Sequence, residues 1–416
     1  MGKREDILII GGGVIGVCTA FYLQEQGRSV RLIEKLGICA GSSYGNAGLV
    51  SSTYAIPLAA PGVMSKGLRW MLNPEGPFYI KPRPDLELIR WLWRFRGACN
   101  EEKMHRTIKV LLELWKAGGH LHGQLNNNHS IDFDYEHNGR LLLFRSQAEM
   151  EREIKYSKLL GEYGVKSRIL NAAEVKDMEP YVQPDVVGGI FLESYAHIAP
   201  DRFVLEMARL AEEKGAALQT GTEVLGFETD GGRISSVITT RGDFSPNQVV
   251  LAAGSWSALL AGELGVRLPI QAAKGYSVTV KKTPTMPSRP LSLGEVKVAV
   301  TPMGDRLRFT STLDLSGLDF SVDRRRIAAI RSAAKDYLCG VENVDLLEIW
   351  RGLRPTTPDS LPLIGRSKKI KNLIVASGHG MLGMAHGPIT GLLVSQIIAG
   401  ADTSLDLTPF RVERFG

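Results

Sequence analysis

Three features of the 416-residue sequence predict an α/β fold, in which an α+β domain built on an antiparallel sheet is inserted into a Rossmann-like domain. The first is a strand–turn–helix–strand pattern at the N-terminus, which is typical of a parallel βαβ unit. The second is a buried strand pattern, Gln248–Ala252, that turns at glycine into a helix and can return to the same sheet. The third is a series of antiparallel strand patterns between Leu268 and Ala334. The Rossmann-like domain is therefore predicted to be discontinuous in the sequence.

The N-terminal unit begins with Ile7–Ile10, a leucine among three β-branched isoleucines, as expected for a buried strand. A segment without proline, Val14–Gln26, then carries apolar residues at helical spacing. A second strand pattern, Ser29–Ile33, ends at the acidic residue Glu34. The chain thus starts with a strand–helix–strand unit that ends on an acid.

Between the first strand and the helix, Gly11, Gly13 and Gly16 form the pattern G-x-G-x-x-G. In this motif the first glycine permits a tight turn, the second lets the backbone approach a pyrophosphate, and the third lets helix and strand pack closely. Unpaired N–H groups at the helix N-terminus favour the diphosphate. Glu34 follows Gly16 by about 20 residues, the spacing expected for an acid that hydrogen-bonds an adenosine ribose. The unit predicts binding of an adenine dinucleotide, and NAD and FAD both remain open at this point.

The composition excludes several classes of protein. A hydrophobic content of 44% and a charged content of 23% are ordinary for a soluble globular chain. The net charge of +6 is spread over the sequence without a dense basic run, so we expect no nucleic-acid partner. The four cysteines are scattered, which favours a reducing compartment and no metal site. The first strand begins too early for a signal peptide, and we expect a cytoplasmic protein.

Two long stretches carry no charged residue. One runs from Leu36 to Ser65 and the other lies between Lys371 and Asp402. The second contains glycines and two histidines, His379 and His386, so a membrane-spanning helix is not expected. We interpret both stretches as segments that line a buried cofactor.

Helices are predicted where apolar residues recur with a period of 3.6. One of them starts after Asn171, an N-cap residue followed by glutamate at the third helical position. The others cover Asp85–Arg96, Met104–Leu125, Met150–Tyr163, Asp201–Lys214 and Gly387–Ala399. The first of these mixes arginines with aromatic residues, so it either lies on a membrane surface or packs one face into the core.

Strands are predicted at short apolar or β-branched runs bounded by turn residues. They cover Arg140–Phe144, Gly188–Phe191, Ala217–Gln219, Glu223–Thr229, Ile234–Thr239, Gln248–Ala252, Ser277–Lys281, Val296–Thr301, Arg306–Thr312 and Leu373–Ala376.

Four further segments, taken in order with the N-terminal unit, carry a family resemblance. They are the small-residue loop Gly41–Gly48, Lys274–Ser277, Trp350–Asp359 and the glycine loop Gly378–Gly383. Together they resemble the flavin-dependent D-amino-acid oxidase/dehydrogenase superfamily, and most closely its bacterial D-amino-acid dehydrogenases. The resemblance spans nearly the whole chain and implies that the dinucleotide is FAD.

The resemblance also implies a division into domains. Residues 1–55, 197–262 and 345–416 are expected to form the FAD-binding domain. Residues 56–196 and 263–344 are expected to form the substrate-binding domain. The residues expected to bind FAD are Gly11, Gly13, Val14, Ile15, Gly16, Glu34, Lys35, Ser42, Ser43, Asn46, Ala47, Gly48, Val224, Ala253, Gly254, Gly378, His379, Gly380 and Gly383.

Arg354 is the strongest candidate for the substrate carboxylate, because the family places such an arginine in a Gly-Leu-Arg-Pro context and a guanidinium offers two parallel donors. Arg351 is the competing residue. His379 is expected either to donate a hydrogen bond to flavin or substrate, or to be structural. Tyr276 is expected either to line the substrate pocket or to pack in the core. The strand pattern Val296–Thr301 lacks the tyrosine with which related oxidases share the carboxylate.

These implications converge on FAD-dependent oxidation of D-amino acids to 2-oxo acids and ammonia, by hydride transfer from Cα to flavin N5. The electron acceptor stays open among oxygen, a quinone, a dye, a partner flavoprotein and the respiratory chain, and so does contact with the inner face of the cell membrane. One alternative is an enzyme of the same superfamily, of the secondary-amine type, that acts on sarcosine, glycine or a D-proline derivative. Two others are an NAD-dependent dehydrogenase and a non-catalytic or membrane-docked electron-transfer flavoprotein.

Overall fold

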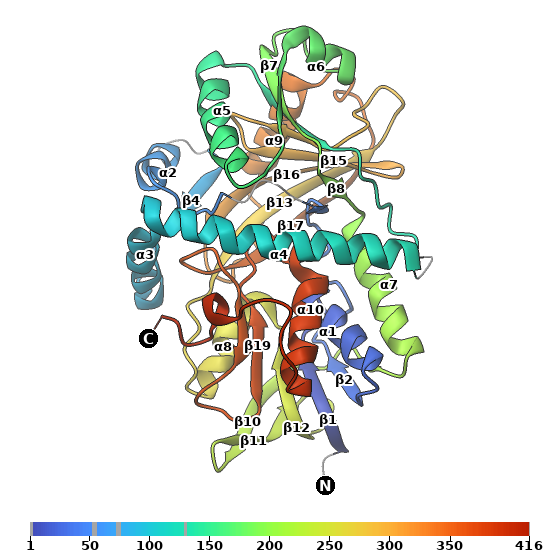
Figure 1. Cartoon of the computed structure of the whole chain (residues 1–416), viewed down its shortest axis with the longest axis vertical. Coiled ribbons are helices and arrows are strands. Elements are labelled where there is room, and N and C mark those ends of the chain that lie inside the picture. The colour runs from blue at the N-terminus through green and yellow to red at the C-terminus, as the bar shows by residue number, and fades with distance from the viewer. Residues whose placement is uncertain (1–2, 52–55, 72–75, 129–130, 416) are drawn as a thin grey trace.

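The computed structural model of the chain describes residues 3–51, 56–71, 76–128 and 131–415. Within these ranges the protein has a mixed α/β fold with two large sheets, one toward each end of the long axis of the molecule (Figure 1). Helix α4, Glu101–Asn128, crosses the molecule between them. Residues 1–2 and 52–55, part of the predicted segment 1–55, lie outside the described residues, and 52–55 also belong to the first charge-free stretch.

The first sheet has eight strands and contains the N-terminal unit. Five of them run parallel in the order β9-β2-β1-β12-β19, with β18 antiparallel at one edge and the β10–β11 hairpin joined to β12. The strands are β1 Lys3–Ile10, β2 Val30–Ile33, β9 Ala217–Gln219, β10 Val224–Asp230, β11 Arg233–Thr239, β12 Phe244–Leu251, β18 Leu363–Arg366 and β19 Leu373–Ser377. The predicted return of the Gln248–Ala252 segment to the first sheet is confirmed by the pairing of β12 with β1.

Both faces of the parallel sheet are covered. Ile7 and Ile9 pack in one core with α1, α7 and α10, whereas Leu8 and Ile10 pack in another with α8 and the β10–β11 hairpin. Burial on both faces explains why the second half of β1, Ile7–Ile10, is an unbroken apolar run. The helices are α1 Val14–Glu25, α7 Pro200–Glu213, α8 Ser257–Glu263 and α10 Gly383–Ala399.

The second sheet has nine strands in the order β17-β13-β16-β15-β14-β5-β7-β6, with β4 paired to β16. The strands are β4 Phe78–Ile80, β5 Arg140–Phe144, β6 Arg168–Asn171, β7 Gly188–Leu192, β13 Gln271–Lys281, β14 Leu291–Leu293, β15 Val298–Met303, β16 Arg306–Leu315 and β17 Leu346–Thr356. The sheet is mixed, because β14 pairs parallel with β5 and β16 pairs parallel with β4.

Strand β17 departs from the predicted division of the chain. The boundary at residue 345 assigned it to the FAD-binding domain, but it pairs antiparallel with β13 from Gln271–Thr356 to Val280–Leu346. Backbone hydrogen bonding along this length makes β17 the edge strand of the second sheet. The segment that carries Arg354 is therefore built into the same sheet as β13.

The remaining elements connect and cover the two sheets. Helix α9, Arg324–Tyr337, packs on one face of the second sheet in a core that includes Val278 and Leu141. Helix α6 starts with the predicted capping box, since Asn171 and Glu174 bond each other's backbone N–H groups at 3.0 and 2.8 Å. The other elements are α2 Val63–Met71, α3 Leu86–Ala98, α5 Gln147–Gly161, the short helices η1 Gly254–Trp256 and η2 Thr408–Phe410, and the two-stranded sheet of β3 Leu49–Ser51 and β8 Ala196–His197.

Helix α10 begins one turn before the predicted start at Gly387. Pro388 has no backbone N–H, so the carbonyl of Met384 four residues earlier loses its helical partner. His122 of α4 supplies the missing donor, with Nε2 at 3.1 Å from that carbonyl oxygen. The proline is tolerated because a residue more than 250 positions away in the sequence satisfies the orphaned group.

Candidate active site

The candidate site lies where the parallel strands of the first sheet end. Parallel strands present their carboxyl ends at the same edge, and ligands bind there where neighbouring connections diverge. Strand β1 is followed by Gly11, β12 by Ala253 and Gly254, and β19 by Gly378, while β2 ends next to Glu34. Segments far apart in the sequence thus meet at one edge of the sheet. The sequence predicted this for β1 and β12.

A cavity of about 1310 Å³ opens at this edge and extends to the second sheet. It is larger than the roughly 300–1,000 Å³ of an ordinary small-molecule site, as a dinucleotide together with a substrate requires. The predicted site residues that line it are Gly11, Gly13, Val14, Ile15, Glu34, Lys35, Ser42, Ser43, Asn46, Ala47, Val224, Ala253, Gly254, Tyr276, Arg354, Gly378, His379, Gly380 and Gly383. Gly16 and Gly48 are not among the lining residues.

The glycines at the start of α1 leave room that no other residue would leave. Gly11 has φ +116°, and a Cβ there would lie 2.5 Å from the carbonyl oxygen of Ala252. A Cβ on Gly16 would collide with the carbonyl oxygen of Gly11, so this glycine lets α1 pack against the end of β1. The backbone can therefore approach a ligand closely at Gly13, which lies between them and faces the cavity.

Glu34 is held on the cavity wall by two backbone N–H groups. Its Oε2 accepts a hydrogen bond from the N–H of Gly12 at 2.7 Å, and its Oε1 accepts one from Leu36 at 2.9 Å. These bonds orient the carboxylate on the cavity wall. Lys35 beside it forms an ion pair with Glu223 at 2.6 Å, and both residues line the same end of the cavity.

Ser43 ties the small-residue loop to the first helix. Its Oγ accepts a hydrogen bond from the N–H of Val14 at 3.0 Å, in the first turn of α1. Ser42 donates to the carbonyl of Leu353, and Ser255 donates to the same oxygen at 2.9 Å. The loop and β17 are thereby fixed to the dinucleotide-binding edge.

Arg308 is a site residue that the sequence reasoning missed. Its side chain is buried, and Nη1 donates to the backbone carbonyls of Tyr44 and Asn46 at 2.8 and 3.1 Å. Burial lowers the pKa of this guanidinium, and Asp201 and Glu348 oppose the shift. The sequence shows only an arginine between the apolar residues Leu307 and Phe309, and this pattern does not say which backbone the arginine holds.

Trp350 is a second such residue: it begins the segment Trp350–Asp359 that carries the family resemblance, but no role is predicted for its side chain. A Cβ on Gly45 or on Gly352 would overlap its ring, so the indole packs against the small-residue loop and against β17. The ring also lines the cavity. Both glycines are required because the aromatic face approaches the backbone directly.

Arg354 extends over β13 toward β16. Its Nη1 donates to the carbonyl of Thr312 at 2.6 Å, and a Cβ on Gly275 would collide with the guanidinium. Burial lowers the pKa of Arg354 to about 10, and the nearby Asp314 carboxylate opposes this shift. The group therefore stays charged at neutral pH. None of the ion pairs found among the described residues includes it.

His379 is fixed within the C-terminal glycine loop. The Nε2 atom lies 3.0 Å from Thr390 Oγ1 of α10, and the side chain is 4% exposed. Burial lowers the pKa of His379 to about 3, so the imidazole is neutral at physiological pH. The backbone N–H of Gly380 donates to Pro355 at 2.8 Å, which joins this loop to the strand that carries Arg354.

Tyr276 points away from Arg354. Side chains alternate along a strand, and Gly275 is the residue of β13 beneath the guanidinium. The Tyr276 ring belongs to the core under α9, and its hydroxyl accepts a hydrogen bond from the N–H of Asp323 at 3.2 Å. This placement favours the packing alternative for Tyr276.

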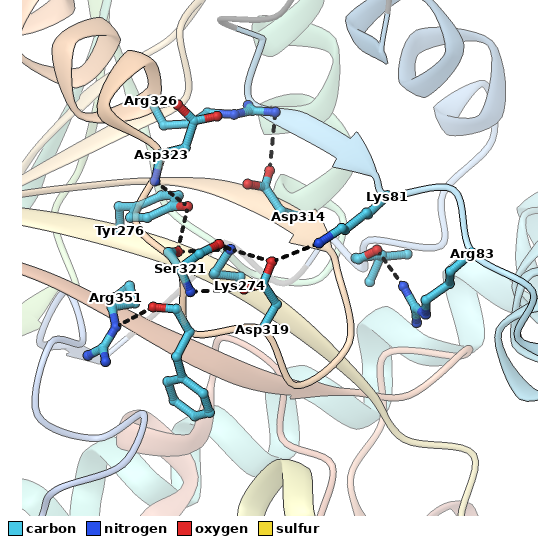
Figure 2. Close-up of polar contacts among 12 residues, drawn as sticks. Lys81, Arg83, Lys274, Tyr276, Asp314, Asp319, Ser321, Asp323, Arg326 and Arg351 are labelled. Carbon is cyan, nitrogen blue, oxygen red and sulfur yellow. Dashed lines mark hydrogen bonds and ion pairs between the residues drawn. The ribbon is translucent and has the colours of Figure 1, made fainter.

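The loop that joins β16 to α9, residues 316–323, lies over the second sheet, as Figure 2 shows. Lys274 Nζ donates to the carbonyl of Ser321 at 3.0 Å and pairs with Asp319 at 3.2 Å. Arg351 donates to the carbonyl of Phe320 at 2.9 Å, and its guanidinium lies 5.2 Å from that ring. Phe320 lines the cavity. Arg351 therefore fixes the loop residue Phe320 at the cavity wall, whereas Arg354 faces the cavity interior.

Comparison with known proteins matches these features. A model of the family described as FAD dependent oxidoreductase matches residues 6–397. The chain is 32% identical over 415 residues to a protein of Granulibacter bethesdensis named D-amino acid dehydrogenase, covering 98% of this chain and 99% of that protein. It is 30% identical over 396 residues to a protein of Helicobacter pylori with the same name, covering 95% of each.

Solved structures share the fold. Glycine oxidase from Bacillus cereus superimposes with a TM-score of 0.77 at 24% identity, covering 96% of both chains. L-proline dehydrogenase from P. horikoshii gives a TM-score of 0.74 at 21% identity, covering 100% of this chain and 98% of that one. At these identities the two structures establish the fold alone.

Proposed function

The chain belongs to the FAD dependent oxidoreductase family, and from this premise we propose that it is an FAD-dependent D-amino-acid dehydrogenase. The substrate class follows from the relatives named D-amino acid dehydrogenase, which match it over nearly their whole length. The enzyme would oxidise D-amino acids to 2-oxo acids and ammonia and pass the electrons to a quinone or another acceptor.

The observation that carries this proposal is the guanidinium of Arg354. It is charged, it faces the cavity, and its bond to Thr312 uses one of its five N–H donors. An amino-acid carboxylate can accept two parallel hydrogen bonds from such a group. Substrate held there would be oriented by its carboxylate, with little need for side-chain acid–base chemistry.

FAD, when bound, would supply the acceptor for the hydride from the substrate Cα. The residues that would hold FAD are the glycine turn after β1, Glu34, the loop 41–48 and the loop 378–383. The N-terminus of α1 would receive the diphosphate, because its first N–H groups have no helical partner and its dipole favours an anion. Backbone N–H groups at the start of α10 would stabilise negative charge at the other end of the cofactor.

We propose a division of labour between the two sheets. The first sheet, formed by segments from 1–55, 197–262 and the C-terminal region, would bind FAD. The second sheet, formed by 56–196, 263–344 and β17, would supply the substrate-binding wall. Pairing of β17 with β13 supports moving the second boundary from residue 345 to the end of that strand.

The proposal is tested by a product assay. Purified FAD-loaded protein is supplied with a dye as electron acceptor and with D-alanine, L-alanine, glycine, sarcosine and D-proline in parallel. We expect 2-oxo acid and ammonia in equal amounts from D-alanine and none from L-alanine. Faster turnover of sarcosine, glycine or D-proline would favour the secondary-amine alternative. Glycine oxidase and L-proline dehydrogenase share the fold of this chain, which is why these substrates are included.

We propose peripheral contact with an anionic membrane through α3. Leu86, Ile89 and Trp93 are 70%, 59% and 76% exposed and recur on one helix face, next to the exposed Arg90 and Arg96. The opposite face packs in the core, and the membrane contact is proposed for the exposed face only. None of the helices in the described part of the chain is long and apolar enough to span a bilayer.

Vesicle co-sedimentation tests this contact. Trp93→Glu and Ile89→Glu should each reduce binding to anionic vesicles, because a charge replaces an apolar side chain at the lipid boundary. Leu205→Glu, on α7 and 52% exposed, is the matched control and should leave binding unchanged. Equal binding of all three variants would contradict the proposal. Trp91 is unsuitable for this test, because it is 2% exposed and its indole donates to the carbonyl of Thr356.

A further inference from the structure

A second guanidinium lies on the wall that carries Arg354. In β5, Leu141 and Leu143 pack in the core under α9, whereas the alternate residues Arg140, Leu142 and Phe144 line the cavity. Arg140 is half-buried there. The cavity wall thus carries Arg140 on β5 in addition to Arg351 and Arg354 on β17.

Arg140 is oriented by hydroxyl groups. Its Nε donates to Ser292 Oγ at 2.9 Å, Nη1 donates to the hydroxyl of Tyr195 at 2.8 Å, and Nη2 also donates to Ser292. The guanidinium lies over the Tyr195 ring, 5.0 Å from its centroid. These partners fix its position and leave its charge uncompensated, since no ion pair found among the described residues includes Arg140.

The spacing of the two guanidinium groups is set by the sheet. Arg354 reaches Thr312 on β16, and Arg140 reaches Ser292 on β14, so β15 alone separates the anchoring strands. Ser292 is opposite Ala299, and Ala299 is opposite Thr310, so Thr312 lies two positions further along β16. With neighbouring strands about 5 Å apart and about 3.4 Å per residue along a strand, the two anchors are roughly 12 Å apart. That gap accommodates two carboxylates, each hydrogen-bonded to its guanidinium, joined by a short carbon chain.

The other charged residues at this end of the cavity do not neutralise the positive charge of Arg140. On α5, Glu149 and Arg152 pair with each other. Glu153 is 8% exposed, and its Oε1 is enclosed by protein and has no hydrogen-bond partner, so this oxygen is not presented to a ligand. Lys297, exposed at the cavity wall, adds a positive charge. Glu295 also lines the cavity, but its carboxylate accepts hydrogen bonds from the backbone N–H groups of Arg145 and Ser146 and from the Tyr337 hydroxyl. Arg140 and Lys297 belong to none of the ion pairs found among the described residues, so they are the charged groups there that can pair with an anion.

We propose that Arg140 binds the distal carboxylate of an acidic D-amino acid, so that D-aspartate or D-glutamate is held at both ends, by Arg354 and by Arg140. The inference rests on the proposed function, because it assumes that the α-carboxylate lies on Arg354. It names the substrate class of that site and makes Arg140 a specificity-determining residue.

Turnover of Arg140→Gln tests the proposal against Arg145→Gln, a matched control that removes an exposed arginine just after β5, outside the cavity. The ratio of kcat/KM for D-glutamate and D-aspartate to that for D-alanine should exceed one in the parent protein. It should fall by about tenfold or more in Arg140→Gln, because a hydrogen-bonded charge pair is lost. The control should keep the parent ratio.

A binding measurement separates this inference from the proposed function. Glutarate, succinate and propionate are titrated into the FAD-loaded protein, and the change in the flavin spectrum reports their affinities without turnover. The dicarboxylates should bind more tightly than propionate, and Arg140→Gln should remove that advantage. An unchanged dicarboxylate advantage in Arg140→Gln, a preference for D-alanine, or a preference for D-lysine would overturn the role of Arg140. Failure of every D-amino acid to react, with the dicarboxylate result intact, would instead contradict the proposed function.

Discussion

Thr312 adopts a backbone conformation that β-branched residues rarely adopt, with φ +69°. It lies at a bulge in β16, where the register with β13 shifts between Lys274 and Tyr276. The carbonyl that results accepts the hydrogen bond from Arg354, and Gly275 opposite gives the guanidinium its space. Strained residues and bulges beside a cavity are commonly features of a functional site. Here the bulge at Thr312 orients the side chain of Arg354 through the Thr312 carbonyl.

Replacement of Arg354 by glutamine tests that assignment. Loss of a hydrogen-bonded charge partner costs about 2–5 kcal/mol, which corresponds to a fall in kcat/KM of roughly 30-fold or more. Affinity for propionate, measured through the flavin spectrum, should fall in parallel. Arg351→Gln provides the comparison, because Arg351 holds Phe320 at the rim and should have a smaller effect. A larger loss in Arg351→Gln would assign the carboxylate to Arg351 instead.

At the scale of elements, the sequence predicted best where local pattern and burial agree. The bounds of β5 and β9 are those predicted, since each is a short apolar run ended by turn residues. The start of α10 was wrong because a proline within the predicted first turn normally marks a helix boundary. The donor that makes it tolerable, His122, belongs to another helix, and no local pattern reveals it.

The turn after β1 provides a prediction at this scale. In Gly16→Ala the new methyl group would meet the carbonyl of Gly11, and α1 would have to move away from the strand. Overpacking of this kind costs about 1–3 kcal/mol, so FAD affinity should fall roughly 5- to 150-fold. Flavin absorbance per protein after dialysis measures the loss. Gly37→Ala, with no atom within 4 Å of its added Cβ, should retain the parent flavin content, and equal loss in both variants would contradict the account.

At the scale of the whole molecule, the order of motifs predicted the family, and the comparison with family models confirmed it. The contacts between distant segments could not be predicted from the sequence. Arg308 holds the carbonyls of Tyr44 and Asn46, and β17 pairs with β13, yet neither relation has a local signature. Strand register and the target of a long side chain depend on the assembled sheets, which a single sequence does not specify.

Buried histidines predict how the stability of the whole protein depends on pH. Burial lowers the pKa of His122 and of His197 to about 4 and that of His379 to about 3, and it lowers that of His386 as well. Below pH 6.5, the ordinary value, the unfolded chain binds protons that the folded chain excludes. Stability is therefore full above pH 6.5 and falls as the pH drops toward 4, by roughly 3 kcal/mol for His122 alone.

Urea unfolding at a series of pH values measures this dependence. In His122→Gln the free energy of unfolding should fall less steeply with decreasing pH than in the parent, because one excluded proton no longer contributes. His137→Gln, at an exposed position, is the control and should keep the parent slope. An unchanged slope in His122→Gln would show that the protonation of His122 does not drive the loss of stability.

Anaerobic titration of the FAD-loaded protein tests the central claim most directly. Successive additions of D-alanine or D-glutamate should bleach the oxidised-flavin absorbance completely, whereas the L-enantiomers should leave it unchanged. In Arg354→Gln the same bleaching should need much higher concentrations of the D-amino acid. Persistent flavin colour with every D-amino acid, or equal bleaching by D- and L-enantiomers, would contradict the assignment of the chain as a D-amino-acid dehydrogenase.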